Sequence, residues 1–323
     1  VTWQWIFGNG ATSSDQSPIP QVYPLPGDYT VLLSITDING CEADTSKIVT
    51  IYPMPEANFI ADNFCQGTAN VLHDVSVVGH DTINQWQWSF GDGYFSSLQN
   101  PLHLYSDSGL YQVVLTASTQ HCSDSDTGQL YVAPMPIINI SPSSQSGCHL
   151  MSVTFNNTTT GASAFFWNFN DGVTSIEQSP THIFLNTTTA DITYNVQVIA
   201  YSGNGCSDTL IIPIVTHPNP VAALASDALP SCSPNIVNFT NMSTGSTSCL
   251  WDFGDGTTST AINPNHVFLN DTSYIIYYIT TLHVYSDFGC VDSAKYYITV
   301  YPTPDYEFVI SPDTVCHPAL TSI

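Results

Sequence analysis

The chain has 323 residues, of which 26 are acidic and two are basic, so its formal net charge is −24. This charge repels phosphate backbones and anionic membrane surfaces, which excludes nucleic acid as a partner. The sequence has no apolar run of the roughly 20 residues that cross a bilayer, so we expect no direct membrane insertion. Because 43% of the residues are hydrophobic and 12% are aromatic, ordinary hydrophobic cores can still form.

A six-residue motif, Trp-x-Phe-x-Asx-Gly, occurs four times. Its copies begin at Trp5, Trp88, Trp167 and Trp251, which lie 83, 79 and 84 residues apart. In a strand, two side chains separated by one residue point to the same face, so both rings are predicted to lie in a core. The Asx-Gly pair that follows is typical of a tight turn. Each copy is therefore predicted to be a core strand that leads into a hairpin.

The same elements surround each copy. A Pro-x-Pro joint is followed by a short strand, a cysteine, a second strand and the tryptophan strand; the joints are at 53–55, 134–136, 218–220 and 302–304. After the turn come a proline-led motif with His103, His182 or His266, an alternating strand, a cysteine turn and a final strand. Seven short strands in about 80 residues are typical of an immunoglobulin-like sandwich. We therefore expect an all-β fold of tandem β-sandwich domains.

The joints divide the chain into five expected parts. These are an N-terminally truncated repeat at 1–52, three repeats at 53–133, 134–217 and 218–301, and the start of a further repeat at 302–323. Two prolines with little Gly or Ser around them favour stiff, extended backbone. We therefore expect neighbouring repeats of one long chain to be each other's partners, held at a limited set of angles.

The order of motifs resembles a known family. WDFGDG at 251–256, an Asn-Pro-x-His-x-Phe/Tyr motif, Gly-x-Tyr-x-Val-x-Leu at 109–115 and a closing Pro-x-Pro joint resemble the PKD domain, an immunoglobulin-like sandwich of extracellular proteins. The first repeat departs from this pattern, with Asn9 for Asp and Gln21 for His, and the fourth lacks the Gly before Tyr278. The scarcity of basic residues, the paired cysteines and a recurrent Cys-x-Asp-Thr/Ser pattern further resemble tandem PKD repeats in giant adhesins of gliding bacteria, of the SprB type.

Eight of the nine cysteines fall into two alternating classes. The early class is Cys65, Cys148, Cys232 and Cys316, and the late class is Cys41, Cys122, Cys206 and Cys290, with early-to-late spacings of 57, 58 and 58 residues. Such regularity, without a Cys-x-x-Cys pair, indicates disulfides rather than a metal site. The ninth, Cys249, is expected to be a lone buried thiol.

Two pairing schemes are open. Pairing within a repeat would join Cys65 to Cys122. In a PKD-like sandwich, however, the early loop and the last hairpin lie at opposite ends, about 20 Å apart, and a disulfide needs Cα atoms within about 7 Å. Pairing between consecutive domains would join Cys65 to Cys206 and Cys148 to Cys290, and would leave Cys41, Cys122, Cys232 and Cys316 to partners outside the chain.

The resemblance implies secretion to the cell surface and a mechanical role. The expected function is a structural stalk or filament segment of a large adhesin, with self-association into a filament as a further expectation. The alternatives are accessory modules of a secreted protease or polysaccharide hydrolase, or carbohydrate-binding modules. We expect no enzyme, because the sequence has no nucleophile elbow, zinc-ligand spacing or phosphate-binding loop.

On this interpretation, the polar residues of the repeats are expected to have structural roles. The three motif histidines lie one in each domain and are expected to bond local backbone, since Gln21 replaces the fourth. No cofactor is expected, except that calcium could bridge acidic residues at the joints, namely Glu56, Asp62, Asp227, Asp305 and Glu307.

Overall fold

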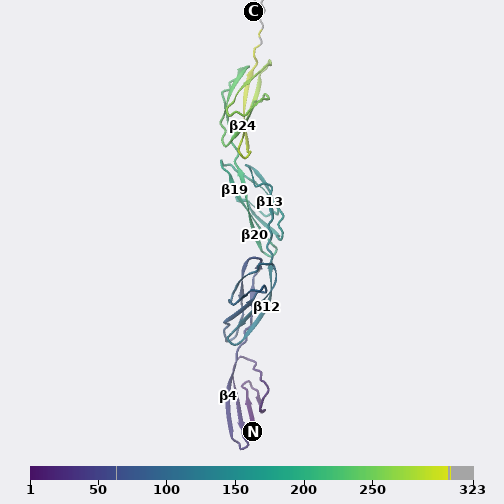
Figure 1. The fold of residues 1–323 in the computed structure, drawn as a ribbon, viewed down its shortest axis with the longest axis vertical. Coiled ribbons are helices and arrows are strands. Elements are labelled where there is room, and N and C mark those ends of the chain that lie inside the picture. Colours follow the sequence, from purple (N-terminus) through teal and green to yellow (C-terminus); the bar gives the residue numbers. More distant parts are fainter. Residues whose placement is uncertain (63, 305, 307–323) are drawn as a thin grey trace, which may run out of the picture. The chain divides into compact units, whose positions relative to one another are not determined.

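The computed structural model describes residues 1–62, 64–304 and 306, and all regular structure in this part is β (Figure 1). The predicted all-β class is confirmed. None of the described residues belongs to a helix that could span a bilayer. Two compact units divide the chain: unit 1 contains Val1–Ile137, Thr160–Ala164 and Ala200–Asp208, and unit 2 contains Ile138–Thr159, Phe165–Ile199 and the residues from Thr209 onward.

Unit 1 begins with one antiparallel sheet of order β2-β1-β3-β4. Its strands are β1 (Thr2–Ile6), β2 (Thr12–Ser13), β3 (Gly27–Thr36) and β4 (Glu42–Ile51). Trp5 lies opposite Leu33 and stacks beside Phe7, with ring centroids 6.1 Å apart. The described residues of this repeat form a single sheet, so nothing faces Trp5 from a second one and its side chain is partly exposed. The expected core position of Trp5 is therefore only half realised.

The second repeat, also in unit 1, is a complete sandwich of two sheets with orders β10-β7-β5 and β6-β12-β11-β8-β9. The strands are β5 (Phe59–Ala61), β6 (Phe64–Cys65), β7 (Ala69–Asp74), β8 (Gln85–Ser89), β9 (Phe95–Ser96), β10 (Leu102–Leu104), β11 (Gly109–Ser118) and β12 (Ser123–Ala133). Alternate residues of β11 point inward, where Val113 and Leu115 pack with Trp88, Phe90 and Leu72. The alternation that predicted this strand therefore also builds its core.

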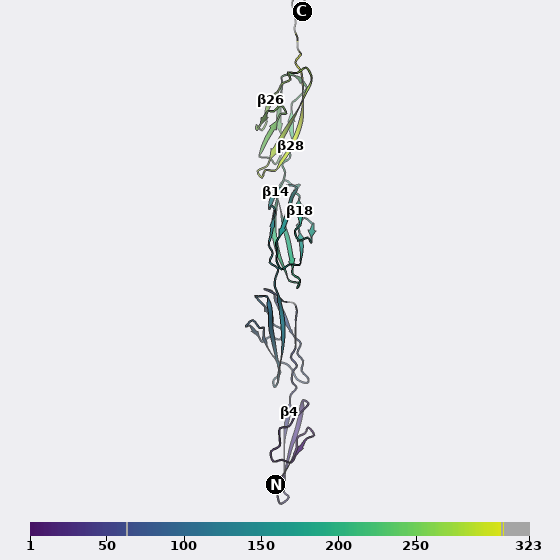
Figure 2. The ribbon, with the colours of Figure 1, turned by 90° about the vertical axis from the view of Figure 1, so that its right-hand side faces the viewer.

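The third repeat has the same pair of sheets, with orders β13-β15-β18 and β14-β20-β19-β16-β17. Its strands are β13 (Ile140–Pro142), β14 (Ser146–Cys148), β15 (Met151–Asn157), β16 (Ala164–Asn168), β17 (Thr174–Ser175), β18 (Thr181–Phe184), β19 (Ile192–Tyr201) and β20 (Ser207–His217) (Figure 2). Trp167 is fully buried, as are its neighbours Phe155 and Val198.

The fourth repeat lies within unit 2 and follows the same plan, with sheet orders β21-β23-β26 and β22-β28-β27-β24-β25. Its strands are β21 (Leu224–Ser226), β22 (Ser231–Cys232), β23 (Asn235–Asn241), β24 (Ser248–Asp252), β25 (Thr258–Ser259), β26 (Asn265–Phe268), β27 (Ile276–Tyr285) and β28 (Val291–Tyr301). Trp251 has no exposed surface, and its indole N–H donates to the Ala261 carbonyl at 3.1 Å.

The first glycine of the motif is needed for a close approach of two strands. At Gly91 and Gly254 the backbone φ angles are +83° and +81°, and an added Cβ would lie 2.6 Å from a carbonyl oxygen of the neighbouring strand. The third repeat has Asn170 at this place, with φ of 64°. Asparagine is among the few side chains that tolerate this left-handed conformation, so the turn is kept without glycine.

Candidate functional site: the domain joints

The early cysteines lie on short edge strands that pair in parallel with the last strand of their own sandwich. Cys65 lies opposite Ala133, Cys148 opposite His217, and Cys232 opposite Tyr301. The late cysteines instead stand just before that last strand. Because β12, β20 and β28 each have 11 residues, the two cysteine classes of one sandwich are separated by about 35 Å of extended strand.

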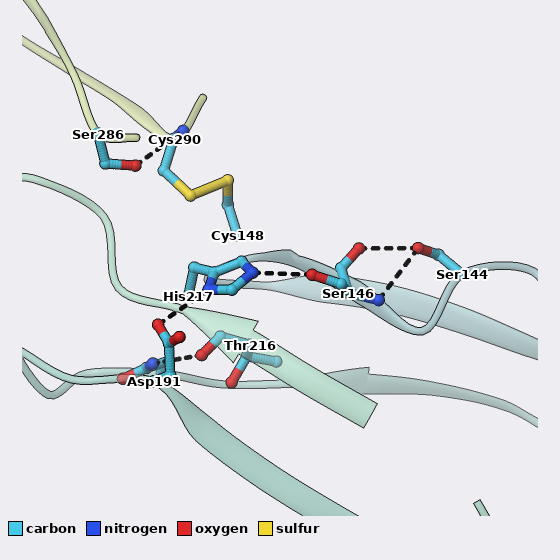
Figure 3. Close-up of a disulfide and its surroundings, with 9 residues drawn as sticks. Ser144, Ser146, Cys148, Asp191, Thr216, His217, Ser286 and Cys290 are labelled. Carbon is cyan, nitrogen blue, oxygen red and sulfur yellow. Dashed lines mark hydrogen bonds and ion pairs between the residues drawn. A yellow bond between two sulfur atoms is a disulfide. The ribbon is translucent and has the colours of Figure 1, made fainter. Parts of the chain in front are cut away.

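Two disulfides are present among the described residues, and both link consecutive sandwiches. Cys65 of the second repeat bonds Cys206 of the third within unit 1, with Cα atoms 5.7 Å apart. Cys148 of the third repeat bonds Cys290 of the fourth within unit 2, with Cα atoms 5.5 Å apart (Figure 3). Of the two schemes open from the sequence, the structure thus has the one between domains. The length of the last strand rules out the other.

The remaining cysteines of the described part are free. Cys41 and Cys232 are exposed, and Cys122 and Cys249 are partly exposed. Cys249 packs at the edge of the fourth core and is not fully buried, which corrects the expectation of a buried thiol. Cys316 lies outside the described residues. That the unpaired members of the two classes bond to partners outside this chain stays a prediction.

Stacked rings occur at two joints. Tyr52 stands before Pro53 and stacks on His121, with centroids 3.6 Å apart and planes 14° apart. His217 stands at the corresponding place before Pro218 and stacks on Phe288, with centroids 3.6 Å and planes 4° apart. In both pairs, the second ring belongs to the hairpin that precedes a late cysteine. The corresponding residue of the second repeat is Ala133, so this contact is not required for a disulfide at the joint.

The aspartate of the Cys-x-Asp pattern accepts a hydrogen bond from the backbone that follows the Pro-x-Pro joint at the start of the same repeat. The Ala57 N–H donates to Asp124 Oδ2 at 2.9 Å, and the Ala222 N–H donates to Asp292 Oδ2 at 2.8 Å. Each N–H lies two residues after the second proline of a Pro-x-Pro joint. The aspartate at the start of the last strand therefore fixes the direction in which the chain leaves the joint. This role was not predicted, because the partners are 67 and 70 residues apart.

The three motif histidines bond a carboxylate rather than the backbone, which corrects the sequence expectation. The Nε2 atoms of His103, His182 and His266 lie 2.7, 2.6 and 2.7 Å from Oδ2 of Asp92, Asp171 and Asp255. Each imidazole also stacks on the motif phenylalanine, as in the His266–Phe253 pair, with centroids 4.0 Å apart. In the first repeat, Asn9 donates instead to the Val22 carbonyl at 2.9 Å.

The described members of the acidic set expected to bind calcium do not gather into a metal-binding group. The described residues contain no group of three or more His, Cys, Asp or Glu side chains arranged to hold a metal ion. Asp227 accepts hydrogen bonds from the side chain and the N–H of Asn238, which lower its pKa and occupy both oxygens. Asp305 and Glu307 lie outside the described residues. Calcium at the joints stays a prediction.

The joint of unit 2 carries a second polar network around His217. The Nδ1 atom of this residue is 2.8 Å from Asp191 Oδ1, and its Nε2 atom is 2.7 Å from Ser146 Oγ (Figure 3). The Asn186 side chain holds the loop before Asp191, because its Nδ2 atom donates to the carbonyls of Ala190 and Thr216 at 2.8 and 2.7 Å.

This network was not predicted, because its members are far apart in the sequence and only a comparison of the repeats points to them. Ser146 and His217 are 71 residues apart, and His217 and Asp191 are 26 residues apart. The signal in the sequence is the residue that lies opposite the early cysteine. It is His217 in the third repeat, whereas the second and fourth repeats have Ala133 and Tyr301 there.

Tandem sandwiches with short proline linkers and disulfides between neighbours define a multidomain protein of the immunoglobulin-like class. The model of the PKD domain family matches residues 1–51, 52–133 and 217–300, which are more than half of the chain. The chain therefore belongs to the PKD domain family, as the motif order indicated.

Solved structures similar to this chain include isolated PKD domains and longer immunoglobulin arrays. The PKD1 domain of Vibrio anguillarum Epp is 26% identical, with 24% of this chain and 93% of that one covered and a TM-score of 0.23. The PKD1 domain of the Vibrio cholerae metalloprotease PrtV is 23% identical, with coverages of 25% and 98% and a TM-score of 0.22. A three-immunoglobulin-domain fragment of titin is 12% identical, with coverages of 79% and 100% and a TM-score of 0.39.

Proposed function

We propose that the chain is a structural segment of a large secreted adhesin, in which it forms part of a stalk or filament on the cell surface. The observation that carries this proposal is the pair of disulfides between consecutive sandwiches, Cys65–Cys206 and Cys148–Cys290. Disulfides persist in oxidising surroundings, which supports an extracellular location. The finer proposal is an adhesin of the SprB type of gliding bacteria, whose chains self-associate into a filament.

Stiffness follows from having two covalent connections at a joint. Domains linked by one short segment usually move relative to each other. A Pro-x-Pro linker restricts the backbone, and a disulfide from the early loop adds a second connection away from the linker. At the joint of unit 2, bending also has to disturb the His217–Phe288 stack. This role requires neither enzymatic turnover nor a cofactor, and we propose neither.

One observation favours a second candidate function, carbohydrate binding by the fourth repeat. Tyr277 and Tyr297 lie on neighbouring strands of one sheet, are each 67% exposed, and flank Ile279, which lies opposite Tyr297. Exposed aromatic rings on a sheet can stack against sugar rings. Retardation of the chain by neutral polysaccharides in affinity electrophoresis, lost on Tyr297→Ala, would support this candidate. Equal mobility with and without polysaccharide would remove it.

The stalk proposal is tested by removing one disulfide without disturbing the sandwiches. We compare the chain with the Cys148→Ser/Cys290→Ser double variant by small-angle X-ray scattering and thermal unfolding. The variant is expected to keep its folded sandwiches and to show a broader distribution of dimensions. Cys249→Ser, which removes a free thiol of the same unit, is the matched control and should behave as the parent chain. Equal flexibility of the parent and the double variant would contradict the proposal.

A further inference from the structure

Ser146, His217 and Asp191 are arranged as a nucleophile, a base and an orienting carboxylate. Ser146 Oγ lies 2.7 Å from one imidazole nitrogen, and Asp191 Oδ1 lies 2.8 Å from the other. Such a constellation is recognised by its geometry and roles rather than by sequence order or fold. With the proton of the ring on Nδ1, held by Asp191, the Nε2 lone pair faces the serine hydroxyl.

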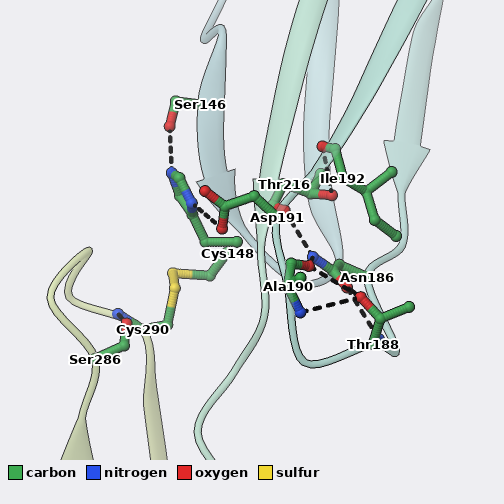
Figure 4. A network of polar contacts seen from close by, with 11 residues as sticks. Ser146, Cys148, Asn186, Thr188, Ala190, Asp191, Ile192, Thr216, Ser286 and Cys290 are labelled. Carbon is green, nitrogen blue, oxygen red and sulfur yellow. Dashed lines mark hydrogen bonds and ion pairs between the residues drawn. A yellow bond between two sulfur atoms is a disulfide. The ribbon is translucent and has the colours of Figure 1, made fainter. Parts of the chain in front are cut away.

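The fold brings the three residues together from separate parts of the third sandwich. Ser146 and Cys148 alternate on one face of β14, and Cys148 lies opposite His217 in the parallel pair with β20. Ser146 and His217 are therefore diagonal neighbours on that face. Asp191 reaches the imidazole from the loop that the Asn186 side chain ties to the Thr216 carbonyl (Figure 4).

The base is shielded from water while the nucleophile is accessible. The side chain of His217 is 8% exposed and that of Asp191 is 44% exposed, whereas Ser146 is an exposed residue. Phe288 covers the imidazole face to face. The Cys148–Cys290 disulfide anchors the hairpin on which Phe288 stands two residues before Cys290. Exclusion of water strengthens the hydrogen bonds of the imidazole, since charges interact more strongly at low dielectric constant.

The network is not needed to build a joint. The Cys65–Cys206 disulfide forms where Ala133 takes the place of His217. The loop network itself recurs in the fourth repeat, where Asn270 donates to the carbonyls of Tyr274 and Val300 at 2.9 and 2.8 Å. In that repeat, Ile275 takes the place of Asp191 and Tyr301 that of His217. The carboxylate of Asp191 and the imidazole of His217 are therefore present in the third repeat and replaced in the fourth.

We propose that Ser146 is a nucleophilic serine and a site of covalent acylation by uncharged carboxylic esters. Its Oγ atom attacks the ester carbonyl carbon, so that an Oγ–C bond forms and the bond from carbon to the alcohol oxygen breaks. The proton of the hydroxyl passes to His217 Nε2 and from there to the departing alcohol oxygen. Asp191 is a positioning residue that stabilises the imidazolium between these two transfers.

Two features define the acyl donor. The net charge of −24 repels anionic esters, so the donor is uncharged. Asp191 and Phe288 border a hollow of about 720 Å³, but Ser146 is not among the residues that line it. Because Ser146 lies outside this hollow, the hollow does not select the acyl chain, and the donor that we propose is small. The outcome is a modification of the chain, not the turnover of a selective enzyme.

The edge position of β14 places backbone donors near the reacting oxygen. Gln145 accepts from Val215 N–H and His149 N–H donates to His217, so these residues bond β20. Successive N–H groups of a strand point to opposite sides, so those of Ser146 and Cys148 are directed away from β20. The Ser146 N–H donates to Ser144 Oγ at 3.4 Å, so the Cys148 N–H is the donor that we assign to the oxyanion at the ester carbonyl.

The test uses p-nitrophenyl acetate as an uncharged activated ester and the oxidised full chain. We expect a burst of p-nitrophenol, and one acetyl group on the peptic peptide that contains Ser146. Ser146→Ala should abolish this adduct, and Ser152→Ala, which removes an exposed hydroxyl of β15 in the same sandwich, should retain it. An uncharged alkyl fluorophosphonate, with fluoride as the leaving group, provides a second trap for the same oxygen.

The positioning role of Asp191 is tested separately. Asp191→Asn should slow acetylation of Ser146 by about tenfold or more, because the amide favours the wrong tautomer of His217, and Asp191→Glu should restore part of the rate. The thermal unfolding midpoint should be the same in both variants. The proposal is overturned if Ser146→Ala shows the same burst as the parent, if only Lys47, Lys295 and the terminal amine are acetylated, or if Asp191→Asn reacts at the parent rate.

Discussion

The recurring His–Asp pair links the tight turn of the motif to the strand that follows it. In the fourth repeat the carboxylate accepts from Thr257 and His266, and the imidazole lies flat on Phe253. Burial alone would raise the pKa of Asp255, but these hydrogen bonds outweigh it, so the pKa is lowered below the ordinary value of 3.8. The folded state therefore prefers the ionised form of this side chain.

This preference predicts an acid-sensitive contribution to stability. A carboxyl group whose pKa is lowered by folding stabilises the fold above the pKa of the unfolded chain, and this contribution is lost as the pH falls through the folded pKa. Asp255→Asn should lower the free energy of unfolding of the fourth sandwich by about 1–3 kcal/mol at pH 7. The difference should shrink as the pH falls below 3.8.

Urea unfolding of both proteins over a range of pH values measures this difference. Asp287→Asn, a change at an exposed aspartate of the same sandwich, is the control and should have little effect at any pH. A deficit in Asp255→Asn that stays constant down to pH values well below 3.8 would mean that the charge of Asp255 is not what stabilises the turn.

Single elements show how far the sequence predicted the fold. The sandwich strands were predictable because inward Trp, Phe and Val alternate with polar residues, and this alternation is local. The partner of His266 was not, although Asp255 is only 11 residues away, because backbone and carboxylate oxygens are both suitable acceptors. The Ser146–His217 contact was still less predictable, since it depends on which short strand lies beside β20.

The tryptophan strand allows a matched comparison between repeats. Trp251→Ala should cost about 3–5 kcal/mol because a fully buried ring is removed. Against the roughly 5–15 kcal/mol that stabilise a small domain, the fourth sandwich should lose much of its stability while the second keeps its own. Trp5→Ala, at the partly exposed copy, should cost less. Hydrogen exchange read by mass spectrometry for each repeat measures this, and equal loss of protection in all repeats would contradict independent domains.

The whole molecule carries its two lysines in the middle of paired strands, which predicts how a protease acts on it. Lys47 lies opposite Val31 in β4, and Lys295 lies opposite Thr281 in β28. A chain held in a sheet cannot adapt to a protease active site until it opens locally. The folded protein should therefore resist trypsin, and Trp251→Ala should be cut at Lys295 much faster than at Lys47. Gel electrophoresis over time distinguishes the two cuts, and equal rates at both sites would contradict the prediction.

The disulfide pattern also determines where tension runs in the third sandwich. A pull that arrives from Cys65 enters at Cys206, passes along β20 and leaves at the linker after His217. This strand is already extended at about 3.3 Å per residue, so it has almost no slack to release. A second covalent route runs from the preceding linker to Cys148 and through its disulfide to Cys290 of the fourth repeat. The residues between Cys148 and Cys206 lie outside both routes, so stretching the chain loads the first and last segments of the domain and leaves this middle part without load. The domain therefore need not unfold for the force to be transmitted.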